Sequence, residues 1–187
     1  MFLFFILKIE CYDYPKQGGI AFIKKEQKLT KILFAVYLVI LTWIILFKMQ
    51  VFIGDLPHIR NINLIPYGQS VIVNGKIDFG EMIDNAIVFI PVGVYITILW
   101  KNWSFWKKVS PIAGISLLYE VLQYIFAIGA TDITDLIHNT VGGIIGIFIA
   151  LSVFKIFPKQ ANQILNVLAM IGTILVLGFI IVIFVVN

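Results

Sequence analysis

Long apolar runs alternate with short polar stretches along almost the whole chain. Five runs are long enough for membrane helices, at 29–49, 84–100, 109–128, 132–157 and 164–186. A helix needs about 20 apolar residues to cross the hydrocarbon core of a bilayer, where it satisfies its own backbone hydrogen bonds. The pattern therefore predicts an all-α fold, a polytopic membrane helix bundle with about five transmembrane helices.

The composition agrees with a multi-pass protein of the cell membrane and argues against other classes. Of the 187 residues, 60% are hydrophobic and 13% are charged, whereas soluble domains carry about 25% charged residues. The formal net charge of +4 does not indicate nucleic-acid binding, because the lysines flank apolar runs. The single cysteine, Cys11, excludes an intramolecular disulfide.

The distribution of basic residues predicts the orientation in the membrane. Five transmembrane spans would place the start of the first run and the connections around 101–108 and 155–160 on the same side of the membrane. Nine lysines lie there: Lys24, Lys25, Lys28, Lys31, Lys101, Lys107, Lys108, Lys155 and Lys159. Three basic residues, Lys48, Arg60 and Lys76, lie on the other side. The positive-inside rule then predicts that the N-terminus is inside the cell and the C-terminus outside.

The apolar runs also predict how the chain is divided. Residues 1–28 are expected to form an N-terminal interfacial or poorly ordered segment, 29–157 a membrane domain, and 158–187 a C-terminal transmembrane helix. An open alternative is that the true start lies downstream of Met1, and N-terminal sequencing of the native protein would decide this.

Two connections between the runs have distinct characters. Residues 50–83 contain several Gly and Pro residues, which argue against a long helix there. Within them, the stretch from Asn61 to Tyr67 mixes Ile and Leu with Asn and Pro, which favours an ordered segment at the membrane interface. Residues 129–131 are expected to form a tight turn between the third and fourth helices.

Several polar side chains interrupt the apolar runs, although a residue such as Asp at the centre of a membrane helix costs about 2.5–3.5 kcal/mol. Glu120 falls near the middle of the third run, and Gln123 lies one turn further on the same face. The predicted topology brings them to the outer half of the membrane with polar residues from three other segments. The predicted binding cluster consists of Asn63, Pro66, Asn85, Glu120, Gln123, Asp132, Asp135 and Asn139.

Each of these residues also has a structural interpretation. Asp132 can cap the fourth helix, Glu120 and Gln123 can bond a neighbouring helix, and the asparagines can bridge helices or satisfy backbone that Pro91 frees. His138 is interpreted as an interfacial packing residue. A second predicted set allows helices to approach closely, without fixing the oligomeric state, and consists of Pro91, Gly93, Gly142, Gly143 and Gly146.

The sequence shows no recognisable catalytic motif. There is no His-Glu-x-x-His helix, no Gly-x-Ser-x-Gly elbow and no Gly-rich phosphate loop. Arg60 is the one arginine, which excludes a phosphate clamp of several arginines. No catalytic residue, cofactor or metal ligand is therefore predicted. A divalent cation at the carboxylates is chemically conceivable, but nothing in the sequence supports it.

Four motifs resemble, in order, those of the VanZ-like family of bacterial membrane proteins, which is named for a teicoplanin-resistance protein. They are Asn63-Leu64-Ile65-Pro66, Asn85-x-x-x-Phe89-x-Pro91-x-Gly93, Glu120-x-x-Gln123, and Asp132-x-x-Asp135-x-x-x-Asn139-Thr140-x-x-Gly143-x-x-Gly146. Together they cover roughly residues 30–155. Many members carry an Arg shortly before the first Asp of the fourth motif, where this chain has Gly129-Ala130-Thr131. If that Arg pairs with a carboxylate, the carboxylate needs another partner here.

The resemblance implies a multi-helix bacterial membrane protein, some of whose relatives lower susceptibility to teicoplanin-type lipoglycopeptides. The first hypothesis is that an outer-leaflet polar site binds a lipid headgroup, a lipid-linked cell-wall precursor or a lipoglycopeptide. Two alternatives remain open: a membrane enzyme acting on a lipid-linked substrate, and a purely structural membrane protein. A transporter is disfavoured, because the inner half of the runs holds little polarity beyond Thr97, Ser110 and Ser116.

Overall fold

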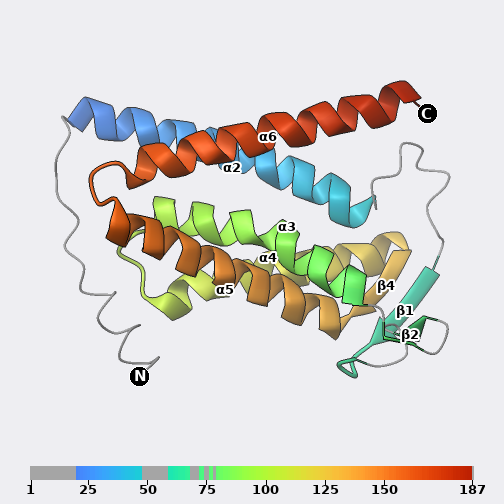
Figure 1. The fold of residues 1–187 in the computed structure, drawn as a ribbon. Coiled ribbons are helices and arrows are strands. Elements are labelled where there is room, and N and C mark those ends of the chain that lie inside the picture. The colour runs from blue at the N-terminus through green and yellow to red at the C-terminus, as the bar shows by residue number, and fades with distance from the viewer. Residues whose placement is uncertain (1–19, 48–58, 68–71, 74–75, 78, 187) are drawn as a thin grey trace.

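The computed structural model describes residues 20–47, 59–67, 72–73, 76–77 and 79–186. Five of its helices are long and apolar enough to cross a membrane, and they lie side by side along one direction (Figure 1). This confirms the predicted all-α membrane bundle. The alternative start downstream of Met1 concerns residues that lie outside the described ones.

The helices alternate in direction along the bundle (Figure 1). In chain order they are α2 (Ile20–Leu46), α3 (Phe79–Leu99), α4 (Phe105–Phe126), α5 (Ile133–Ile156) and α6 (Ala161–Val186). Helix α2 begins at Ile20, so residues 20–28 of the predicted N-terminal segment continue into the first span. The other predicted runs agree with the helices to within about five residues.

The connection before α5 differs from the sequence prediction. Instead of a tight turn at 129–131, the chain forms strand β4 (Ile128–Asp132), which pairs in parallel with strand β1 (Ile59–Asn63). The turn is confined to Ala127, which adopts a left-handed conformation with φ of 56°. Pairing with β1 gives both extended backbones hydrogen-bond partners, which a bare turn inside a membrane protein would lack. A short hairpin, β2 (Ile72–Val73) with β3 (Lys76–Ile77), lies at the same end.

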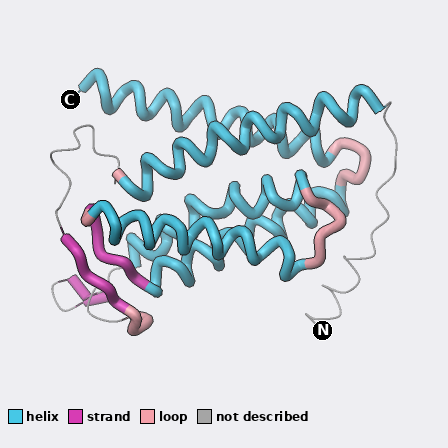
Figure 2. Tube along the Cα trace, turned by 180° about the vertical axis from the view of Figure 1, so that it is seen from behind, coloured by secondary structure: helices cyan, strands magenta, loops and turns pink. Residues whose placement is uncertain are grey.

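The two ends of the bundle are therefore different. The strand end carries β1 and β4, the ends of α2 and α4, and the starts of α3 and α5, as Figure 2 shows from behind. The opposite end, here called the lysine end, carries the α3–α4 and α5–α6 connections. Trp100 and Trp103 stack there with ring centroids 5.0 Å apart. This alternation agrees with the predicted grouping of the connections, while the side of the membrane that each end faces stays a prediction.

Helices α3 and α5 form the tightest contact of the bundle. A Cβ atom built on Gly142 would lie 1.9 Å from the carbonyl oxygen of Ala86, and one on Gly146 would lie 2.0 Å from that of Ile90. From the other side, a Cβ on Gly93 would lie 1.9 Å from the Gly143 oxygen. The absence of side chains at these positions lets the two backbones meet, and this fixes the relative position of the α3 and α5 polar residues.

Pro91 lies inside α3 and cannot donate a hydrogen bond to the Ile87 carbonyl. The hydroxyl of Tyr37 on α2 donates to the adjacent carbonyl of Val88. The predicted kink at Pro91 stays a prediction, but a donor from a neighbouring helix does reach this region of α3. A core of fully buried residues, including Phe89 and Ile147, fills the space between α2, α3, α4 and α5.

Candidate functional site

The centre of the candidate site is the return of β4 along the end of α4. The backbone N–H of Asp132 donates to the Oε2 atom of Glu120 at 2.8 Å, and the Thr131 hydroxyl donates to the Glu120 carbonyl at 3.0 Å. Glu120 lies six residues before the end of α4 at Phe126, about 9 Å along the axis. Strand β4 therefore re-enters the bundle, and the carboxylate of Glu120 accepts a backbone donor that would otherwise be buried without a partner.

Asp132 links this return to the next helix and to β1. Its Oδ1 atom accepts the N–H of Thr134 at 2.8 Å and caps the start of α5. Its Oδ2 atom accepts the side-chain amide of Asn63 at 3.0 Å. Asn63 and Asp132 occupy paired positions at the last register of the β1–β4 ladder. The capping role foreseen for Asp132 thus coexists with a contact to the Asn63 motif.

The chain after Asn63 is held to α5 by Thr134. The Oδ1 atom of Asn63 accepts the N–H of Ile65 at 3.2 Å, and the N–H of Tyr67 donates to the Thr134 hydroxyl at 3.1 Å. Tyr67 has a left-handed backbone with φ of 58°, and its ring meets that of His138 edge-on with centroids 5.8 Å apart. Pro66 is exposed in this turn. The segment is thus ordered by contacts with α5.

The remaining predicted residues form separate pairs between helices. The Asn85 amide on α3 donates to Asp135 Oδ1 on α5 at 2.7 Å. The Asn139 amide donates to the Ser116 hydroxyl on α4 at 2.9 Å. The Gln123 amide donates to the Ile45 carbonyl on α2 at 3.1 Å. The predicted residues therefore lie between the strand end and the middle of the bundle, where their hydrogen bonds connect α2, α3, α4, α5, β1 and β4.

Three buried polar atoms among these side chains have no hydrogen-bond partner in the part of the chain that the structure describes. They are Gln123 Oε1, Asn139 Oδ1 and His138 Nε2. Asn139 and Gln123 are almost fully buried, at 2% and 5% exposed. A buried polar atom without a hydrogen-bond partner costs about 1–3 kcal/mol, so these atoms are the positions where a water or a ligand would form a hydrogen bond.

Metal binding gains no support from this arrangement. In the described residues, no group of three or more His, Cys, Asp or Glu side chains is placed to hold a metal ion. The carboxylates of Glu120 and Asp132 accept backbone and side-chain N–H groups, and Asp135 accepts the Asn85 amide. The oxygens of these carboxyl groups therefore bond N–H groups of the chain itself.

Sequence reasoning missed three residues of the site. Thr134 and Tyr67 connect the Asn63 segment to α5, and Ser116 bonds Asn139. For Ser116 a signal was available, because it precedes Glu120 by four positions and so shares its helix face. No sequence signal pairs Tyr67 with Thr134, since they are separated by 67 positions and meet only because β1 and β4 run in parallel.

Comparisons with known proteins identify the relatives of this architecture. The family model described as VanZ/LLP1 matches residues 34–156, which include every residue of the predicted cluster. This chain belongs to the VanZ/LLP1 family. It is 42% identical to Protein VanZ of Enterococcus faecium over 137 residues, which cover 72% of this chain and 79% of that protein. No solved structure matches the chain.

Membership also bears on the departure at residues 129–131. Residues 129–131, where many VanZ-like members are expected to carry an Arg, lie in strand β4. Within this stretch Ala130 pairs with Asn61 of β1. In this chain the Asp132 carboxylate accepts the Asn63 amide and the Thr134 N–H. If the family's Arg pairs with the carboxylate of Asp132 in other members, then in this chain two neutral N–H groups donate to that carboxylate instead. The family match ends at residue 156, so α6 lies outside it.

Proposed function

We propose that this protein lowers susceptibility to teicoplanin by binding the polar part of a membrane-associated ligand at the strand end. The ligand is a lipid headgroup, a lipid-linked cell-wall precursor or the lipoglycopeptide. The observation that supports this most directly is the meeting of four VanZ-like motifs at one end of the bundle, in a chain 42% identical to Protein VanZ.

The strand end combines the properties that such a ligand requires. Next to the buried polar residues, the turn after Asn63 exposes apolar side chains, with Leu64 and Ile65 each 71% exposed. Exposed apolar groups beside polar ones suit the boundary between headgroups and hydrocarbon. Asn139 Oδ1 is an acceptor, and His138 Nε2 is an acceptor or a donor according to the tautomer of the ring; neither has a partner among the described residues. A hydroxyl-rich ligand can donate to the first and bond the second in either tautomer. The positive-inside rule favours placing this end outside the cell, opposite the lysine end.

The test compares wild type with two variants that replace a carboxyl group with an amide of the same shape, Glu120→Gln and Asp135→Asn, and so keep one acceptor oxygen. Asp84→Asn is the matched control, because Asp84 is an exposed carboxylate adjacent to Asn85 at the same end. Each form is expressed in a susceptible Gram-positive host, its membrane abundance is measured, and its inhibitory concentrations for teicoplanin and vancomycin are determined. Wild type and Asp84→Asn should protect against teicoplanin, and the two site variants should protect several-fold less at equal abundance.

Two results would contradict the proposal. If wild type gives no protection, the resistance function is wrong for this protein. If both site variants protect as well as wild type, the carboxylates serve only to hold the segments together. The second result would favour the purely structural alternative, which draws its support from the interhelical hydrogen bonds of these residues.

The side of the membrane is tested separately by cysteine labelling. In a Cys11→Ser background, a cysteine replaces either Leu64 at the strand end or Trp106 at the lysine end, which are 71% and 74% exposed. A membrane-impermeant maleimide applied to intact cells should label the Leu64 position alone. Labelling of the Trp106 position alone would place the strand end in the cytoplasm and would contradict binding at the outer face.

A further inference from the structure

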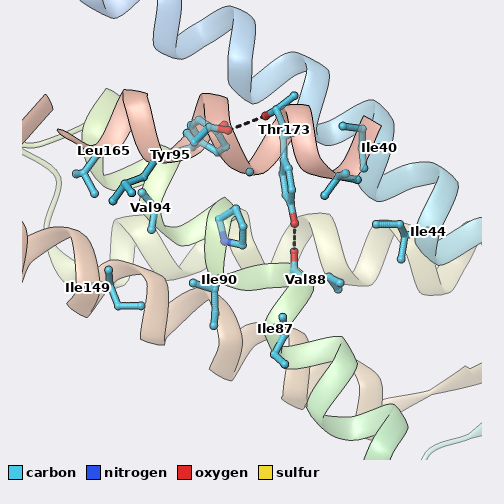
Figure 3. Close-up of a pocket in the computed structure, with 16 residues that line it drawn as sticks. Ile40, Ile44, Ile87, Val88, Ile90, Val94, Tyr95, Ile149, Leu165 and Thr173 are labelled. Carbon is cyan, nitrogen blue, oxygen red and sulfur yellow. Dashed lines mark hydrogen bonds between the residues drawn. The ribbon is translucent and has the colours of Figure 1, made fainter. Parts of the chain in front are cut away.

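A pocket of about 400 Å³ lies in the middle of the bundle, away from the polar site. Its walls come from α2, α3, α5 and α6, with Tyr37 and Ile40 from α2, Pro91 from α3 and Ile149 from α5 (Figure 3). One face of α6 completes it, through Leu165, Leu168, Ala169, Gly172, Thr173 and Val176. These positions recur every three to four residues, so they form one stripe along α6.

The lining has no charged residue, and its hydroxyl groups are already engaged. Tyr37 donates to the Val88 carbonyl, and the hydroxyls of Tyr95 and Thr173 are hydrogen-bonded to each other, as the dashed lines in Figure 3 show. The pocket therefore offers a ligand almost purely apolar contacts. Apolar cavities of this kind do not hold water, and a cavity left empty forfeits the dispersion contacts of its walls.

The pocket opens sideways to the surface that faces lipid. Ile87 of α3 and Leu168 of α6, both in its lining, are 54% and 57% exposed. Both helices are long and apolar enough to cross a membrane, and in a bilayer the mouth of the pocket would therefore face lipid. The species that reach this mouth are hydrocarbon chains, and its volume lies within the range of about 300–1,000 Å³ usual for ligand sites.

We propose that the pocket between α6 and the α2–α3–α5 bundle is a binding site for an acyl chain of a membrane phospholipid. This goes beyond the proposed function, because α6 lies outside the residues that the family model matches and the pocket does not include the polar cluster. The charge-neutral lining suits a hydrocarbon chain and leaves the headgroup at the membrane surface. Bound lipid would then fill the space between α6 and the family domain.

The glycines of α6 provide a matched pair of variants. Gly172 lines the pocket, and a Cβ atom added there would meet nothing within 4 Å. Gly178, six residues further along the same helix, is equally open but is not in the lining. Gly172→Phe should place a ring in the pocket, whereas Gly178→Phe should place it in the surrounding lipid. At both positions the Cβ atom meets nothing within 4 Å, and both substitutions replace a glycine within a helix, so the folded state should be retained.

The experiment uses vesicles of phosphatidylglycerol that contain a phosphatidylglycerol with a diazirine on its acyl chain. After irradiation, labelled peptides are mapped by mass spectrometry. Tyr95 and Leu165 are the reporters, since they line the pocket and are 2% and 4% exposed. Leu175, which is 68% exposed on α6, reports general contact with lipid. Thermal unfolding of each purified variant verifies that it is folded, and Gly172→Leu provides a smaller filling group.

Wild type and Gly178→Phe should be labelled at Tyr95 and Leu165. Gly172→Leu should reduce that labelling and Gly172→Phe should reduce it several-fold, with Leu175 unchanged. Equal labelling of these reporters in Gly172→Phe and Gly178→Phe would overturn the proposal, as would an absence of label there in wild type. Label at the reporters that teicoplanin removes, with Leu175 still labelled, would support the proposal and show that the apolar part of the antibiotic competes with the lipid chain for the pocket.

Discussion

The close contact of α3 with α5 makes Gly142→Ala the most informative single substitution for the fold. The new Cβ atom would lie 1.9 Å from the Ala86 oxygen and 2.7 Å from its carbonyl carbon. Both are backbone atoms of a helix, so no side chain can rotate to relieve the clash. The helices must instead move apart by about 1.1 Å at this point to restore even the shortest contacts seen in real structures, near 3.0 Å.

The cost of this movement can be compared with the gain from alanine. Overpacking in a close-packed interior typically destabilises by about 1–3 kcal/mol, whereas replacing a helical glycine with alanine stabilises by up to about 1 kcal/mol. With the full alanine gain, the balance is a net destabilisation of up to about 2 kcal/mol. The same movement would strain the 2.7 Å hydrogen bond between Asn85 and Asp135, which joins the same two helices.

The control is Gly114→Ala on α4, where a new Cβ would meet nothing within 4 Å and where the helical gain alone applies. Thermal unfolding of the detergent-purified proteins should show a lower midpoint for Gly142→Ala and an equal or higher midpoint for Gly114→Ala. Gly93→Ala should behave like Gly142→Ala, because its Cβ would lie 1.9 Å from the Gly143 oxygen. Equal midpoints for Gly142→Ala and Gly114→Ala would refute the inference that the α3–α5 contact depends on these glycines.

Three further predictions concern single interactions. Thr134→Val should speed hydrogen exchange at the Tyr67 amide, because it removes the hydroxyl that accepts this N–H, whereas Thr134→Ser keeps the hydroxyl and should not. Equal exchange rates in the two variants would mean that this hydrogen bond does not order the turn after Asn63. Burial lowers the pKa of Lys101, at the lysine end, from 10.5 to about 8, so the unfolded state binds more protons between these values and stability should rise with pH across that window. Lys101→Gln should flatten this part of the pH dependence of thermal unfolding, and an unchanged profile would argue against the burial. Ser116→Ala should lower the free energy of unfolding by about 1–3 kcal/mol, because it leaves the buried Asn139 amide nitrogen without its acceptor. The double variant Ser116→Ala/Asn139→Leu should lose less stability than the sum of the two single variants. Additive losses would show that the two side chains do not interact.

The helices were predictable from the sequence because a membrane helix has a local signal. Its length, its apolar character and its self-contained backbone hydrogen bonds are all properties of one continuous segment. The glycine stripe of α5 was similarly visible as spacing, although its partner was not. The sequence shows that Gly142 and Gly146 permit a close approach, but only the structure identifies Ala86 and Ile90 of α3 as the backbone that approaches.

The strand pair was not predictable in this way. Strands β1 and β4 have five residues each, and they are separated by α3 and α4 along the chain. Neither segment shows the alternation of a half-buried strand, and the residues 129–131 contain the small residues of a turn. Their pairing depends on a non-local contact, in which Asn63 and Asp132 meet at the end of the ladder. The sequence therefore indicated which motifs carry polar groups. Only the fold shows that Asn63 of the first motif donates a hydrogen bond to Asp132 of the fourth.

The re-entry of β4 gives a physical reason for a carboxylate in the middle of an apolar helix, and it also defines what can be learned from changing it. Glu120 accepts the N–H of Asp132 through one oxygen, and the amide oxygen of a glutamine can accept the same donor. Packing alone therefore requires an acceptor at this position, but it does not require a charge. Glu120→Leu would remove both the acceptor and the charge, so its loss of function would not separate the two roles. Glu120→Gln keeps one acceptor oxygen and replaces the other with an amide donor, so a loss of protection in that variant at full abundance would show that the carboxyl group itself is required.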